Sequence, residues 1–197
     1  MIKYFEKTLK ILDDSLHSID MQVFNSLVEQ SMETLQRGNK IVVSGLGKNV
    51  PICDKFVGSM LSLGLNANFL HTNSAVHGDM GMVHSGDLVV ILTKSGATKE
   101  SVYLAKLLMK RENVNLWLLT FSGDSVLVEL IGKNKSLVIE LEDEGDMWNI
   151  MPNNSTTLNL IVLQGVVMEI ARRMNLSLDD FKRNHPGGAI GEILSHE

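Results

Sequence analysis

The chain has 197 residues, of which 44% are hydrophobic and 21% are charged, and its formal net charge is −5. This composition is typical of one soluble globular domain and excludes a disordered or collagen-like chain. Because the net charge is negative and the basic residues are scattered, we find no basic face that could bind nucleic acid. The single cysteine, Cys53, excludes an internal disulfide, which predicts a reducing, cytoplasmic setting.

No segment has the pattern of a signal peptide or of a membrane anchor. The amino-terminal residues lack the long apolar core that a leader peptide needs. The longest apolar region, 158–171, is interrupted by Asn159, Gln164 and Glu169 and is too short to span a bilayer. We therefore expect a buried helix in this region and no contact with a membrane.

Residues 2–37 carry apolar side chains at helical spacing, for instance Phe5, Leu9 and Leu12. This spacing predicts two helices that are broken near Ser18. The first of them could cover the sheet of the domain or pack on a partner chain.

Short apolar runs alternate with helical patterns in the middle of the chain. The predicted strands are 40–44, 66–70, 88–92, 115–120 and 137–141. Helical patterns begin near residues 50, 102 and 124, and the stretch 72–79 is expected to be irregular. This alternation predicts an α/β fold, with a parallel sheet, helices on both of its faces and right-handed crossovers.

The end of the chain is predicted to be helical. After the acidic run 140–144, Asn154 or Ser155 is expected to cap the long apolar helix. A last helix is predicted at 177–183, before a His-Pro-Gly-Gly segment. Since no repeat or linker is present, we expect one domain. Its parts are amino-terminal helices over 2–37, an α/β core over 40–175 and a carboxyl-terminal segment over 177–197.

Three turns rich in glycine or hydroxyl groups precede predicted helices, at 44–49, 95–98 and 155–157. Such turns lie along one edge of a parallel sheet, so their hydroxyls and amides could converge on one phosphate. One such turn alone is commonly a plain helix cap, whereas three in one chain favour a phosphate site. The first turn has neither P-loop spacing nor the third glycine of a dinucleotide fingerprint, which argues against ATP and NAD.

Five ionisable side chains are candidates for proton chemistry. Lys48 lies in the first turn, where an ammonium can neutralise a phosphate or an oxyanion, or can remain a surface charge. Glu100 suits the first turn of its helix electrostatically, and Glu144 lies in an acidic run that could simply be solvated. His77 and His185 lie in loops with glycine, which favours accessible imidazoles suited to proton transfer. No two histidines have helical ligand spacing, so a metal site is unsupported.

The order and spacing of these motifs resemble the sugar isomerase (SIS) domain, in its arabinose-5-phosphate isomerase branch, over residues 30–192. The motifs that carry the resemblance are Val43-Ser44-Gly45-Leu46-Gly47-Lys48, His77-Gly78-Asp79, Ser95-Gly96-Ala97-Thr98-Lys99-Glu100, Pro152 with Ser155-Thr156-Thr157, and His185-Pro186-Gly187-Gly188-Ala189. The resemblance implies a three-layer α/β/α sandwich with a five-stranded parallel sheet of the flavodoxin-like kind, and a homotetramer. It corresponds to the short form of the branch, without CBS modules.

By this resemblance the chain is expected to interconvert D-arabinose 5-phosphate and D-ribulose 5-phosphate without a cofactor or a metal. The functional lysine of the family corresponds to Lys48, its carboxylates to Glu100 and Glu144, and its histidines to His77 and His185. As a hypothesis, Glu144 is the base, Lys48 steadies the oxyanion, and His185 assists ring opening or proton relay, in its own pocket or in that of a neighbouring protomer. Glu100 could instead orient the sugar. The residues expected to hold the phosphate are Ser44, Gly45, Gly47, Ser95, Gly96, Thr98, Ser155, Thr156 and Thr157.

The chain departs from the family pattern in two of its turns. Where the family has Gly-Lys-Ser-Gly, this chain has Gly-Lys-Asn-Val at 47–50. Where the family has Ser-Asn-Ser-Gly-Glu-Thr, residues 93–98 gain Lys94 and lose a carboxylate at Ala97. Another pentose or hexose phosphate could therefore be the substrate. A second possible function is a sugar-phosphate sensor that binds without turnover.

Overall fold

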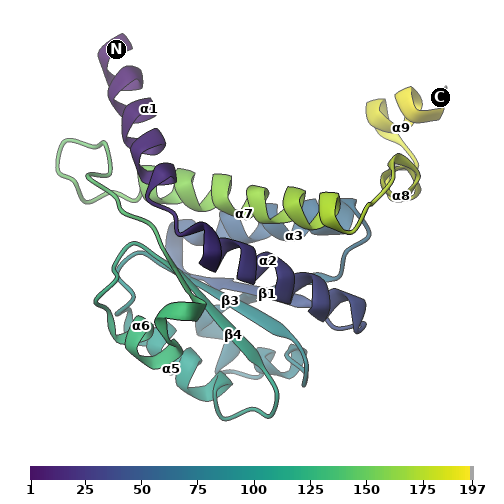
Figure 1. Cartoon of the computed structure of the whole chain (residues 1–197), viewed down its shortest axis with the longest axis horizontal. Coiled ribbons are helices and arrows are strands. Elements are labelled where there is room, and N and C mark those ends of the chain that lie inside the picture. Colours follow the sequence, from purple (N-terminus) through teal and green to yellow (C-terminus); the bar gives the residue numbers. More distant parts are fainter. Residues whose placement is uncertain (196–197) are drawn as a thin grey trace.

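The centre of the computed structural model, which describes residues 1–195, is a sheet of five strands in the order β2-β1-β3-β4-β5 (Figure 1). The strands are β1 (Ile41–Gly45), β2 (Ala67–His71), β3 (Leu88–Thr93), β4 (Asn115–Thr120) and β5 (Ser136–Val138). Each pair of neighbouring strands is parallel, which confirms the predicted sheet. The strand order reverses between β1 and β3, and ligands of open α/β sheets bind at the carboxyl ends of strands at such a point.

Helices cover both faces of the sheet and complete the three-layer α/β/α sandwich (Figure 1). One group packs on the face that carries Val43, Val90 and Trp117. This group consists of α2 (Met21–Gln36), α3 (Val50–Ser62) and α7 (Asn154–Arg173). The other group packs on the face that carries Val42 and Val89. It consists of α4 (Thr72–Ala75), α5 (Lys99–Leu108) and α6 (Val126–Ile131). Adjacent strand residues are thus buried on opposite faces, as expected for a parallel sheet covered on both sides.

Helices at the two ends of the chain extend beyond the sandwich, at opposite ends of α7 (Figure 1). They are α1 (Ile2–His17), α8 (Leu178–Arg183) and α9 (Gly188–Ser195). α1 buries Ile11 and Leu12, whereas Ile2, Phe5 and Leu9 are exposed by 73%, 54% and 66%. Only the carboxyl-terminal half of α1 therefore joins the core. The predicted carboxyl-terminal segment continues to residue 197, and its last two residues lie outside the described ones.

The predicted break near Ser18 is confirmed and has a local cause. α1 ends at His17, and the Asp20 side chain then caps α2 by accepting the N–H groups of Gln22 and Val23. A carboxylate at this position satisfies amides that have no partner within the helix. No helix in the described part of the chain combines the length and the apolar character needed to cross a lipid bilayer.

The strand β5 is shorter than predicted. It ends at Val138, whereas the apolar pattern predicted a strand up to residue 141. The N–H of Ile139 still donates to the Thr120 carbonyl, but the N–H of Glu140 donates to the Ser18 hydroxyl at 2.9 Å. The chain therefore leaves the sheet edge at this point and enters the loop that leads to α7.

The short elements were predicted only in part. The segment 72–79, expected to be irregular, contains the one-turn helix α4, and the helix predicted from residue 124 begins at Val126. Elements of this length are too short to show a hydrophobic period. The short 3-10 turns are η1 (Gly47–Asn49), η2 (Asp79–Met82) and η3 (Lys133–Lys135).

A buried ion pair fixes the amino ends of β1 and β3. The Lys40 ammonium lies 2.6 Å from the Asp87 carboxylate, whose side chain is 1% exposed. The same carboxylate accepts the backbone N–H groups of Lys40 and His84. Burial raises the pKa of Asp87, but the Lys40 ammonium and the two amides together outweigh it and hold the pKa below its ordinary value. The pair therefore stabilises the fold at neutral pH and loses this contribution as the pH falls.

We expect Asp87→Asn to lower the free energy of unfolding by about 3 kcal/mol, because it leaves the Lys40 ammonium largely buried without its counter-ion. Urea unfolding at pH 7 measures this loss. Glu33→Gln, which removes the exposed pair with Arg37, is the control and is expected to change stability by less than about 0.5 kcal/mol. Equal losses in the two variants, or a loss at Asp87 that does not shrink at acidic pH, would contradict the assignment.

Candidate functional site

The turn after β1 brings α3 close to the carboxyl edge of the sheet. A Cβ atom at Gly45 would lie 2.9 Å from Cβ of Asn49 and 3.2 Å from Sγ of Cys53, so only glycine permits this approach. Gly47 has φ +56°, in the left-handed region that favours glycine. The two glycines thus shape a tight turn that presents the exposed Lys48 at the start of α3.

Lys48 lines a small pocket together with residues from two other turns. The lining residues are Leu46, Lys48, Asn49, Lys94, Pro152, Ser155, Thr156 and Asn159. Two ammonium groups therefore face the amino end of α7, a helix of 20 residues. Lysine side chains and the positive partial charge at the amino end of a long helix both favour an anion in this pocket.

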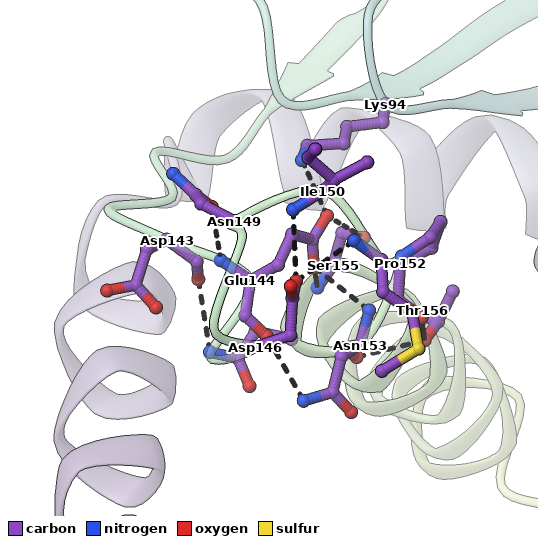
Figure 2. A network of polar contacts seen from close by, with 12 residues as sticks. Lys94, Asp143, Glu144, Asp146, Asn149, Ile150, Pro152, Asn153, Ser155 and Thr156 are labelled. Atoms are coloured by element: carbon purple, nitrogen blue, oxygen red, sulfur yellow. Dashed lines mark hydrogen bonds and ion pairs between the residues drawn. The ribbon is translucent and has the colours of Figure 1, made fainter.

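A buried carboxylate, Glu144, contacts two of these lining residues, Lys94 and Ser155 (Figure 2). Its side chain is 0% exposed. Its Oε1 atom lies 2.7 Å from the Lys94 ammonium and accepts the Ser155 hydroxyl at 2.7 Å. Its Oε2 atom accepts the backbone N–H groups of Ser155 at 2.9 Å and of Asn153 at 3.0 Å. Glu144 is therefore not a solvated charge in an acidic run.

Glu144 also replaces the helix cap that the sequence predicted. The cap residue of α7 is Asn153, whose side chain makes no capping bond, and neither Asn154 nor Ser155 occupies the cap position. The prediction was wrong because a side chain from outside the helix, Glu144, satisfies the first amides of α7. A buried carboxylate at a helix amino terminus gains from the amides and from the helix dipole together.

The environment of Glu144 keeps it ionised. Burial raises the pKa of Glu144, but the hydrogen bonds from the Lys94 ammonium and from the amides of Ser155 and Asn153 outweigh it and hold the pKa below its ordinary value. The four hydrogen bonds also occupy the lone pairs of both carboxylate oxygens. Glu144 can accept a proton from a ligand only after one of these partners moves away.

The loop between Glu144 and α7 is held in shape by a second carboxylate, Asp146. It accepts the backbone N–H groups of Trp148 and Met151. It also accepts that of Ile150 (Figure 2). These amides outweigh the effect of burial and hold the pKa of Asp146 below its ordinary value. At the same time the loop exposes large apolar side chains, with Trp148 at 67% and Ile150 at 74%.

The turn after β3 supplies Lys94 and a group of hydroxyls at the start of α5. Gly96 has φ +60°, and a Cβ atom there would lie 2.1 Å from Oγ of Ser125, so glycine is required. The hydroxyls of Ser95 and Thr98 lie 3.5 Å apart, and Ser95 Oγ accepts the N–H of Ala97. These hydroxyls are on the same turn as the lysine that pairs with Glu144.

The other predicted phosphate ligands already have partners within the chain. Ser44 is 0% exposed, and its hydroxyl lies 2.9 Å from that of Thr72. The hydroxyls of Thr156 and Thr157 both donate to the Asn153 carbonyl. A phosphate would therefore have to compete with these hydrogen bonds or be bound by backbone amides.

The predicted catalytic side chains fall into three places. Lys48 lines the pocket at the amino end of α7. The exposed His77 and Glu100 line a second pocket next to α4 and α5. His185 lies after α8, where its ring stacks on Phe181 with the ring centroids 3.8 Å apart. It lines neither of these pockets within one chain. Nδ1 of His185 lies 2.8 Å from the Phe181 carbonyl and donates to it, which leaves Nε2 as an acceptor.

Two residues of the first pocket were not singled out from the sequence as binding residues. Lys94 directly follows a buried strand, which is a signal that could have identified it. Asn159, four residues after Ser155, is buried and donates from Nδ2 to Oδ1 of Asn49 at 2.9 Å. Its own Oδ1 atom has no hydrogen-bond partner within the residues that the structure describes, so it can accept a hydrogen bond from a ligand. Among residues 1–195 there is no group of three or more His, Cys, Asp or Glu side chains that could hold a metal ion.

Comparison with protein families agrees with this architecture. The SIS domain model matches residues 34–167, which include the three turns described above. The chain belongs to the SIS domain family. The SIS chain is 30% identical over 189 residues to arabinose 5-phosphate isomerase KdsD of Pseudomonas aeruginosa, covering 96% of this chain and 57% of the relative. It is 32% identical over 155 residues to arabinose 5-phosphate isomerase GutQ of Escherichia coli K12. This match covers 79% of this chain and 47% of the relative.

A solved structure is similar to this SIS domain in both fold and sequence. The Escherichia coli CFT073 protein c3406, solved in complex with arabinose 5-phosphate, has a TM-score of 0.84 and is 30% identical. The match covers 94% of this chain and 95% of that one. By contrast, the chain spans about half the length of the curated relatives it matches.

We expect Glu144→Gln to lower the free energy of unfolding by about 2 kcal/mol, because the amide places donors against the N–H groups of α7. The neighbouring Glu142→Gln is the matched control, since Glu142 is exposed, and it is expected to have little effect. Because the folded pKa of Glu144 is lowered, its contribution is present above the ordinary glutamate pKa and is lost as the pH falls. Chemical unfolding at pH 7 and at pH 4 measures both effects, and an unchanged gap between Glu144→Gln and wild type at the two pH values would refute this role.

Proposed function

We propose that this SIS domain is a sugar-phosphate aldose–ketose isomerase, with D-arabinose 5-phosphate and D-ribulose 5-phosphate as its substrate pair. The observation that carries the proposal is the pocket at the amino end of α7, which Lys48 and Lys94 line and where Lys94 pairs with the buried Glu144 carboxylate. The two matched isomerases and the solved sugar-phosphate complex support this choice of substrate. A cytoplasmic location remains a prediction.

The proposed reaction moves two protons without a cofactor. A base removes the proton from C2 of the open-chain aldose, and the electron pair forms an enediolate between C1 and C2. A proton is then delivered to C1, while the hydroxyl proton of O2 passes to O1, which yields the ketose. Carboxylates and imidazoles are suitable groups for such transfers, and a nearby ammonium stabilises the oxyanion that develops.

We assign the roles from the positions of the side chains. Glu144, which is buried behind the pocket residues Lys94 and Ser155, is the base, and Lys48, which lines the pocket, stabilises the enediolate. The hydroxyls and amides of the turn 95–98 bind the phosphate, and the hydroxyls of Thr156 and Thr157 join them by exchanging their hydrogen bonds to the Asn153 carbonyl for the phosphate. Glu100 and His77, which line the second pocket, orient the sugar chain.

His185 is proposed to act in the pocket of a neighbouring copy in a homotetramer. Its free Nε2 atom suits ring opening or proton relay, but it lines neither pocket of its own chain. The exposed apolar residues of α1, such as Phe5 and Leu9, and those of the loop, such as Trp148 and Ile150, offer surfaces for association. Burying them between copies is more favourable than leaving them in water.

A sugar-phosphate sensor is the second candidate function. It is favoured by the hydrogen bonding of Glu144, since a carboxylate with four donors is a good structural anchor and has no free lone pair for a proton. Such a protein binds the ligand and does not turn it over. Turnover and binding therefore have to be measured on the same preparation.

An isomerisation assay across a panel of aldose and ketose phosphates tests the proposal. We expect turnover of arabinose 5-phosphate in the wild type and a loss of about 100-fold or more in kcat for Glu144→Gln, because a positioned base contributes this much. Glu142→Gln is the control and is expected to match the wild type. Binding without turnover of any sugar phosphate would favour the sensor, and equal kcat in Glu144→Gln and wild type would remove the base role of Glu144.

Mixing two inactive variants tests the shared site. We expect Lys48→Ala and His185→Ala each to lose activity, and their co-expressed mixture to regain it, because some pockets then receive Lys48 from one copy and His185 from another. The solution mass is measured on the same samples by light scattering. A monomeric mass, or a mixture no more active than its components, would contradict the assignment of His185.

A further inference from the structure

The four partners of the Glu144 carboxylate are not equivalent. Two are backbone N–H groups at the first turn of α7, and the third is the hydroxyl of Ser155, a residue that is 2% exposed. All three belong to the segment that Glu144 itself anchors. The fourth, Lys94, comes from the turn after β3 and has a side chain that is 44% exposed. Lys94 is therefore the partner that comes from another segment and can leave toward solvent, whereas the Ser155 hydroxyl is enclosed.

Lys94 is also the partner for which a sugar phosphate can compete. Its ammonium is a compact charge on a flexible stem, and phosphate oxygens are strong acceptors for such a group. The lysine lines the pocket at the amino end of α7, and the hydroxyls of Ser95 and Thr98 stand on its own turn. A phosphate bound at that turn lies within the reach of this side chain.

We propose that Lys94 is a substrate-binding residue that pairs with Glu144 in the empty site and transfers to the phosphate of the bound sugar. The transfer leaves the Oε1 atom of Glu144 with the Ser155 hydroxyl alone and frees a lone pair that can take a proton. The Oε2 atom keeps both amides of α7, so the loop stays in place. The inference rests on the proposed isomerase function, since the freed lone pair is the one that the base requires.

Lys94 is the cation that lowers the pKa of Glu144, and other charged groups lie on the neighbouring elements. Lys94 faces it from the turn after β3, and Lys48 lines the same pocket from the start of α3. On the other side, Asp143 is paired with Lys7 of α1, and Asp146 is held by the amides of its own loop. When Lys94 leaves, the carboxylate loses its nearest cation, so its pKa moves up.

The exchange can be followed without any turnover. In proton–nitrogen NMR spectra, the Ser155 amide, which donates to Glu144, reports the titration of this carboxylate. Inorganic sulfate is the probe, because it resembles a phosphate dianion and does not itself titrate near neutral or mildly acidic pH. In the wild type, we expect sulfate to raise the pH midpoint of the titration that the Ser155 amide reports. In Lys94→Met, the pH midpoint of the Ser155 amide titration is expected to be higher than in the wild type even without sulfate, and sulfate is expected not to change it.

Steady-state kinetics give the second readout. The acid limb of kcat/KM reports the free enzyme and that of kcat reports the complex. We expect the kcat limb to lie at higher pH than the kcat/KM limb in the wild type, and the two limbs to coincide in Lys94→Met. The KM of Lys94→Met is expected to rise about tenfold through loss of one charged contact to phosphate, and Lys94→Arg to recover part of it. Lys99→Met, in the first turn of α5, is the exposed control.

The outcomes separate this inference from the proposed function. A Ser155 midpoint that sulfate leaves unchanged in the wild type overturns the exchange, whether or not the protein is an enzyme. The exchange is also overturned if the acid limbs of kcat and kcat/KM coincide in the wild type and both shift in pH in Lys94→Met. In that case Lys94 stays paired with Glu144 in the substrate complex. Loss of all turnover in every assay, with the sulfate response intact, leaves the exchange standing and removes only the isomerase.

Discussion

The ionised carboxylate of Glu144 at the amino end of α7 is the interaction on which the candidate site depends. A buried charge is costly unless donors surround it, and here they come from α7 and from the turn after β3. One side chain therefore ties the loop after β5, the central helix and the carboxyl edge of the sheet together. The walls of the pocket are fixed relative to one another because they share this carboxylate.

Much of the fold could be predicted because its signals are local. Apolar runs such as 88–92 and glycine turns such as 45–47 indicate strands and tight connections without reference to the rest of the chain. Two errors occurred where a side chain outside the element decides the local structure. β5 ends early because the N–H of Glu140 donates to the Ser18 hydroxyl and not to the neighbouring strand. The amino end of α7 is capped by Glu144 instead of by one of its own first residues.

The candidate site was predicted in part for the same physical reason. Lys48 and Ser155 could be assigned to one edge because parallel strands bring successive turns together, and both line the same pocket. The pairing of Lys94 with Glu144 could not be predicted, since these residues are far apart in the sequence and an acidic run resembles a solvated surface. The proposed place of His185 depends on a second copy of the chain, which no pattern within one sequence can position.

The two candidate functions differ in what happens to one lone pair. With all four donors in place, Glu144 holds the loop and the helix but cannot take a proton, which suits a sensor. If the Lys94 ammonium moves to a phosphate, three donors still anchor the loop while Oε1 becomes able to act as a base. Anchoring and catalysis then become compatible in one residue, because the anchor relies on Oε2 and on Ser155, and the chemistry relies on the position that Lys94 vacates. The lysine that distinguishes this turn from the common family pattern is thus the residue that decides between a structural carboxylate and a catalytic one.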